Sequence, residues 1–147
     1  MSEFAERYWG RFSGCIRWEH AEAVAEAAAA SGATWYAVSP EAGPEAPVET
    51  LSGEEAAERL REHLAEMRRA KKGDYCNLVF VDDPEAPGLI KVFHPRRSGD
   101  ACRVGGDPIP PWLLLSRYPV ESAVYAPEPP AEDEPVSRWR RVLRIGS

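Results

Sequence analysis

Residues 93–119 contain the densest group of side chains in this sequence that could do chemistry. Residues 94–103 alone contain one thiol, one imidazole and three guanidinium groups, which are Cys102, His94, Arg96, Arg97 and Arg103. Nearby cations stabilise a thiolate, and the thiolate is the nucleophilic form of cysteine. The stretch therefore suits a reactive Cys102, with His94 available as a base and the three arginines holding an anionic substrate.

The same stretch also suits binding without catalysis. Gly105 and Gly106 lack side chains that would keep an anion away from backbone N–H groups. Trp112 follows them, and tryptophan is a frequent anchor in protein interfaces. A small anionic ligand or a protein partner would both fit this composition. The sequence also leaves open an ordinary polar surface loop with solvated arginines and an inert Cys102.

The remaining imidazoles and thiols give no recognisable reactive pattern. No two histidines or cysteines have the spacing of a zinc-ligand pair, and no phosphate-binding glycine loop or nucleophile elbow is present. We therefore predict no metal and no cofactor, although the sequence leaves open a metal site assembled in space from Cys102, His94 and another element. Cys15 and Cys76 fall within expected strands and are predicted to be packed or sheet-surface residues, not ligands. His63 is predicted to be solvated on a helix flank.

A second candidate binding segment lies at residues 136–147. It contains four arginines and no acidic residue, and Arg138, Trp139 and Arg141 are its predicted binding residues. Residues 126–135 hold four prolines and four acidic residues, which favours an extended spacer. The segment at 136–147 could fold back on the acidic body of its own chain. It could instead dock on an acidic protein or a second copy, or touch an anionic surface such as nucleic acid or lipid.

Composition restricts the class of protein. The 147 residues carry 24 acidic and 18 basic side chains, a formal net charge of -6, which does not favour a nucleic-acid-binding protein. No apolar run approaches the ~18 residues of a membrane span, and the first residues do not resemble a secretory signal. Three separated cysteines favour a reducing compartment, so we expect a cytoplasmic protein.

The positioning elements alternate between strands and helices. Apolar residues recur at every second position over 12–18, which predicts a half-buried strand. An alanine-rich helix is expected over 19–31, followed by an aromatic, β-branched strand over 33–39 and a loop over 41–47. Ser52 and Glu55 have the spacing of a capping box and predict a helix that ends at Gly73.

Strands dominate the rest of the expected domain. They are predicted over 75–82, 88–94, 112–118 and 120–126, with a break at Pro119, and a short helix capped by Ser2 is expected over 2–9. The order β-α-β-α-β-β-β predicts an α+β fold: a mostly antiparallel sheet of about five strands with two main helices on one face. We predict one domain over 1–125, then the spacer over 126–135 and the basic aromatic tail over 136–147.

These patterns favour a small cytosolic, non-enzymatic accessory or regulatory protein. It would bind a protein partner, or a second copy of itself, through residues 93–119 and the basic tail. The alternative is a small thiol-dependent enzyme or redox sensor built on Cys102 in an arginine-rich, anion-binding loop. Neither nucleic acid nor a membrane is an expected partner.

Overall fold

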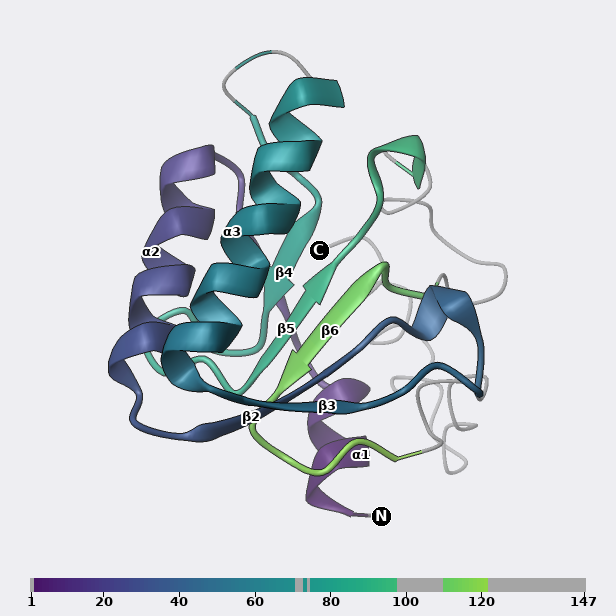
Figure 1. The fold of residues 1–147 in the computed structure, drawn as a ribbon. Helices are drawn as coiled ribbons and strands as arrows, with labels where there is room; N and C mark the ends of the chain where they lie inside the picture. The colour runs from purple at the N-terminus through teal and green to yellow at the C-terminus, as the bar shows by residue number, and fades with distance from the viewer. Residues whose placement is uncertain (1, 71–72, 74, 98–109, 122–147) are drawn as a thin grey trace, which may run out of the picture.

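The computed structural model describes residues 2–70, 73, 75–97 and 110–121. Two long helices, α2 (Trp18–Ala30) and α3 (Gly53–Ala70), lie side by side over one face of a sheet (Figure 1). A short helix, α1 (Glu3–Tyr8), lies apart from them. It packs against the sheet, and Lys91 Nζ joins the two by donating a hydrogen bond to the backbone oxygen of Tyr8 at 2.8 Å.

The sheet has six strands, and every neighbouring pair is antiparallel. Along the chain the strands are β1 (Ser13–Gly14), β2 (Thr34–Val38), β3 (Glu49–Ser52), β4 (Val79–Val81), β5 (Leu89–Val92) and β6 (Leu113–Ser116). Their order in the sheet is β1-β4-β5-β6-β2-β3. Because β6 lies between β5 and β2, Leu115 pairs with both Ile90 and Ala37. The α+β class with two main helices on one face is confirmed.

The helix boundaries follow the capping signals. Ser52 Oγ accepts a hydrogen bond from the backbone N–H of Glu55 at 3.1 Å, and Glu55 Oε1 accepts from the N–H of Ser52 at 2.9 Å. The predicted capping box of α3 therefore forms. Ser2 Oγ caps α1 by accepting from the N–H of Ala5 at 3.1 Å. Gly32, just after α2, has a φ of 66°, a left-handed conformation that glycine adopts without steric cost.

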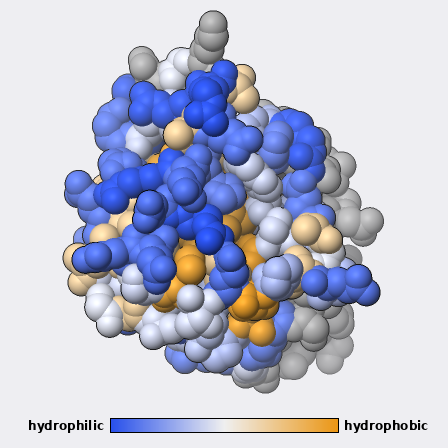
Figure 2. Space-filling model, viewed as in Figure 1, coloured by the Kyte–Doolittle hydropathy of each residue, from blue (hydrophilic) through white to orange (hydrophobic). Residues whose placement is uncertain are grey.

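Small residues let α2 and α3 approach each other closely. The buried face of α2 includes Ala21, Ala25 and Ala28. At the first residue of α3, a Cβ added to Gly53 would lie 2.5 Å from the backbone oxygen of Ala28. Glycine is therefore required there by the neighbouring backbone. The outer surface of the molecule on this side is mostly hydrophilic, with apolar side chains showing in gaps between polar neighbours (Figure 2).

The β4–β5 loop is organised by one carboxylate. Asp82 Oδ1 accepts from the backbone N–H groups of Asp83, Gly88 and Leu89 at 2.8, 2.9 and 3.0 Å. Its side chain is only 8% exposed, and its other oxygen lies 3.6 Å from Arg7 Nη1. Asp82 therefore holds the two ends of the β4–β5 loop together through hydrogen bonds to the loop backbone.

Several expected elements are shorter or differently placed. The strand expected over 12–18 is reduced to β1, since Trp18 already begins α2 and Arg17 forms only an isolated bridge with Tyr75. The strand expected over 75–82 is reduced to β4, because Asn77 has a φ of 55° and interrupts the pairing. The sequence did not predict β3, so the sheet has six strands where about five were expected.

The C-terminal predictions lie mostly beyond the described residues. Val120 and Glu121 are not in a strand, and the rest of the strand predicted over 120–126 is outside the described ranges. The same holds for the domain end near residue 125, the spacer over 126–135 and the tail over 136–147. Within the described ranges, no helix is both long enough and apolar enough to cross a bilayer.

Candidate functional site

Trp112 packs between two imidazoles at one end of the central strands. It directly precedes β6 and is fixed to β5 by a 2.8 Å hydrogen bond from its backbone N–H to the oxygen of Val92. The ring centroid of His63, from α3, lies 4.3 Å from that of the indole, with 63° between the planes. The His94 ring, just after β5, lies 4.7 Å away at 64°. Both imidazole planes are therefore steeply inclined to the indole plane. The indole is only partly buried.

An ion pair extends this arrangement across two short 3-10 helices, η1 (Pro40–Ala42) and η2 (Pro95–Arg97). The Arg96 guanidinium pairs with Glu41, whose side chain is 17% exposed. The backbone N–H of Glu41 donates to the oxygen of Pro111 at 3.0 Å, which places η1 beside Trp112. We call His63, His94, Trp112, Arg96 and Glu41 the Trp112 cluster.

The hydrogen bonds of the two histidines assign their ring protons. His63 Nδ1 lies 2.9 Å from the backbone oxygen of Arg59, and a carbonyl can only accept, so Nδ1 carries the proton. Burial lowers the pKa of His63, which keeps the ring neutral at pH 7 with a lone pair on Nε2. His94 Nδ1 accepts from the backbone N–H of Arg96 at 3.1 Å, so the neutral His94 ring carries its proton on Nε2.

The cluster also contains polar groups without hydrogen-bond partners in the described part of the chain. The indole N–H of Trp112 makes no hydrogen bond there, although Trp112 is only partly exposed. Glu41 Oε2 is buried and has no hydrogen-bond partner among the described residues. A buried acceptor left without a donor is costly to the fold, whereas the partly exposed indole N–H can donate to a ligand or partner.

The structure brings together three of the residues that the sequence singled out, namely His94, Arg96 and Trp112. It adds two that the sequence did not: His63, which is half-buried instead of solvated, and Glu41. Neither carried a sequence signal, because both reach the cluster only through the packing of α3 and η1 against the start of β6.

The other predicted site residues lie beyond the described ranges. These are Cys102, Arg103, Gly105, Gly106, Arg138, Trp139 and Arg141, and for Arg97 only the backbone is described, as the last residue of η2. A thiol reaction at Cys102 with His94 as base therefore stays a prediction. In the described part, the Arg96 guanidinium is already paired with a carboxylate.

The two described cysteines are buried structural residues. Cys15 and Cys76 are 3% and 0% exposed, so of the packed and sheet-surface positions that the sequence left open, both occupy packed ones. Burial, with a smaller effect of Cys76, raises the pKa of the Cys15 thiol to about 12. Cys15 therefore remains a protonated, unreactive thiol at neutral pH.

Across residues 2–70, 73, 75–97 and 110–121, no three His, Cys, Asp or Glu side chains gather closely enough to hold a metal ion. No protein-family model matches this chain, and no curated protein or solved structure matches it. The chemistry of the Trp112 cluster and of the surface around it is therefore the basis for assigning a function.

Proposed function

We propose that this protein is a non-enzymatic accessory or regulatory protein that binds a protein partner at the Trp112 cluster. The observation that carries the proposal is the position of the Trp112 indole, which is partly exposed, fixed by two imidazoles and free to donate its N–H among the described residues. Tryptophan and arginine are the side chains that most often dominate binding energy in protein interfaces.

Pre-organisation favours this role. Binding costs free energy when side chains must be immobilised, and this cost is about 0.5–1.5 kcal/mol for each mobile side chain. Trp112 is already held by His63 and His94, and Arg96 by Glu41. A partner would therefore meet an ordered aromatic and cationic surface.

The unpaired groups suggest what the partner presents. The Trp112 indole N–H and the Nε2–H of His94 are donors, so a partner carbonyl or carboxylate complements them. A peptide backbone offers carbonyl oxygens that can accept from both donors. We therefore propose an extended peptide segment of the partner at this site, with residues 93–119 adding contacts.

Location in the cytosol is also part of the proposal. Cys15 is a buried cysteine that forms no disulfide, which is compatible with a reducing compartment. The thiol-dependent alternative has no described residue that favours it over partner binding, so partner binding is the leading function.

Affinity capture with the full chain tests this function. Wild type, Trp112→Ala and the matched control Trp9→Ala would each be used as bait in native lysate, with folding verified by circular dichroism. Trp9 is a second partly buried tryptophan, located at the end of α1. We expect a partner retained by wild type and Trp9→Ala and lost by Trp112→Ala. A partner retained equally by all three, or no partner and no self-association for any of them, would refute a binding role for Trp112.

A further inference from the structure

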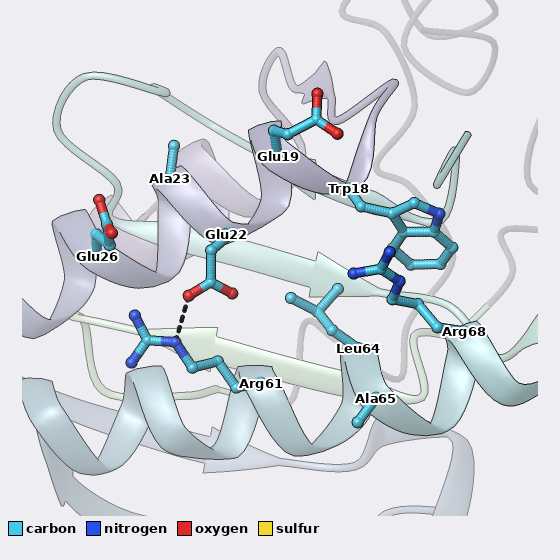
Figure 3. Close-up of a pocket in the computed structure, with 9 residues that line it drawn as sticks. All are labelled: Trp18, Glu19, Glu22, Ala23, Glu26, Arg61, Leu64, Ala65 and Arg68. Atoms are coloured by element: carbon cyan, nitrogen blue, oxygen red, sulfur yellow. Dashed lines mark hydrogen bonds and ion pairs between the residues drawn. The ribbon is translucent and has the colours of Figure 1, made fainter. Parts of the chain in front are cut away.

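A groove of about 550 Å³ runs between the outer sides of α2 and α3 (Figure 3). The groove is hollow because Ala23 and Ala65 have short side chains, whereas most residues around them have long ones. Trp18, Leu64 and Arg68 gather at one end, where the Arg68 guanidinium lies 5.2 Å from the centre of the Trp18 ring. The groove lies on a different side of α3 from His63, so it is separate from the Trp112 cluster.

The charges of the groove are only partly balanced. Glu22 and Arg61 bridge it, with 2.6 Å between Oε1 and Nε. Arg68 is placed over Trp18, which leaves no further cation among the residues that line the groove. Glu19 and Glu26 make no ion pair or hydrogen bond within the described part of the chain. These two free carboxylates lie about 10.5 Å apart along α2, at ~1.5 Å per residue.

The sequence contains a segment with complementary chemistry. Residues 136–147 carry four arginines, no acidic residue and the apolar side chains of Trp139, Val142 and Leu143. In a helix, Arg140 and Arg144 would lie on the same flank of the apolar face, about 6 Å apart along the axis, and their long side chains could reach Glu19 and Glu26 on α2. The same helix would bring Trp139 and the apolar pair to one face.

We propose that the groove between α2 and α3 binds residues 136–147 of the same molecule. Trp139 fills the hollow over Ala23 and Ala65, and the arginines pair with Glu19 and Glu26. This proposal goes beyond the proposed function, because it concerns another surface and makes the basic segment an internal ligand. It does not depend on partner binding at Trp112.

The chain is long enough for this contact. Residues 122–135 connect the last described residue to the basic segment, which is 14 residues. At the polyproline rise of ~3.1 Å per residue they could span about 43 Å. A domain of this size has a radius of gyration of about 14 Å, so the segment can reach any face of it.

Photo-crosslinking in the full chain tests the proposal. Benzoylphenylalanine would replace Trp139, and after irradiation the attachment sites would be mapped by peptide mass spectrometry. We expect crosslinks within monomers to residues 18–26 of α2 and 61–68 of α3. The same photo-crosslinker placed at Val48, an exposed position just before β3, serves as control and should not label the groove.

Two sets of variants make the test decisive. Glu19→Lys with Glu26→Lys should lower the crosslink yield at least about threefold, since two attractive ion pairs become repulsive. Glu45→Lys with Glu85→Lys changes the total charge equally at exposed loop positions and should leave the yield unchanged. Ala65→Met fills the hollow without changing the charge. Because position 65 is exposed on α3, methionine fits there without disturbing the core, and it should also lower the crosslink yield.

Three results would overturn the proposal. One is a crosslink map that excludes the groove. Another is a crosslink yield that falls equally in the Glu19/Glu26 and Glu45/Glu85 variants, or that is unchanged in Ala65→Met. The last is groove crosslinks found only in covalent dimers, which would assign the groove to a second copy of the chain.

Discussion

The imidazole of His63 packs against the indole of Trp112 with 4.3 Å between ring centroids, joining the middle of α3 to the start of β6. This contact buries much of the His63 ring and, with the hydrogen bond to Arg59, fixes the tautomer that faces Trp112. The protonation state of one helix side chain is thus linked to the surface that we propose for partner binding.

We expect the stability of the protein to fall as the pH is lowered through the pKa of His63. Burial lowers the pKa of folded His63 below 6.5, the ordinary value that it has in the unfolded chain. Between the two values the unfolded state binds the proton more readily, so protonation favours unfolding. Denaturant titrations at pH 7.5 and pH 5.5 would measure this loss, and His63→Gln should reduce it. An NMR titration midpoint of His63 at or above 6.5 would contradict the expectation.

Replacement of Asp82 by alanine should destabilise the fold by about 2 kcal/mol or more. The substitution leaves three backbone N–H groups without the carboxylate oxygen that accepts from them. Asp83→Ala is the matched control, since Asp83 Oδ1 accepts one exposed hydrogen bond, from the N–H of Glu85 at 3.0 Å. Its cost should stay below about 1 kcal/mol. Equal costs for the two variants in urea denaturation would show that Asp82 does not organise the loop.

Gly53→Ala should destabilise the protein by roughly 1–3 kcal/mol, the range for overpacking a close contact. Alanine has a better intrinsic helix propensity than glycine by about 1 kcal/mol, so propensity alone predicts the opposite sign. The loss comes from the new Cβ, which would lie 2.5 Å from the backbone oxygen of Ala28. Thermal unfolding of Gly53→Ala beside Glu54→Ala, an exposed neighbour, would separate packing from propensity. A stabilised Gly53→Ala would show that α2 and α3 can move apart at low cost.

Alkylation should distinguish the buried thiols from Cys102. Cys15, with its pKa raised to about 12, and the fully buried Cys76 should resist iodoacetamide in native protein at pH 8 and react once urea is added. Peptide mapping reports each cysteine separately. Rapid native labelling of Cys15 would contradict its burial. A Cys102 reaction with a midpoint well below ~8.5, the pKa of free cysteine, would instead support the thiol-dependent alternative.

The sequence predicted the elements whose signals are local. The Ser52–Glu55 capping box and the Ser2 cap depend on residues three positions apart, and both form as expected. Ala56, Leu60, Leu64 and Met67 recur at helical spacing along α3, and all four are buried. Such features could be predicted because the atoms that satisfy them are close in the chain.

The features that escaped prediction depend on distant contacts. β3 is an edge strand with mostly exposed side chains, so it shows no alternating apolar pattern. The strand expected over 75–82 is shortened at Asn77, which has a φ of 55° and donates its backbone N–H to the oxygen of Cys15 at 3.1 Å. His63 and Glu41 join the Trp112 cluster through tertiary packing alone, so their positions in the chain gave no indication of it.

The position of β6 has a consequence for how the protein is made. Among the described strands, β6 alone is hydrogen-bonded to both halves of the sheet, β1-β4-β5 on one side and β2-β3 on the other. A nascent chain that has not yet released Leu113–Ser116 from the ribosome tunnel has two separate half-sheets and an exposed edge on each. Cooperative folding of the sheet therefore waits until β6 has left the tunnel, and until then the two edges that β6 will join stay unpaired.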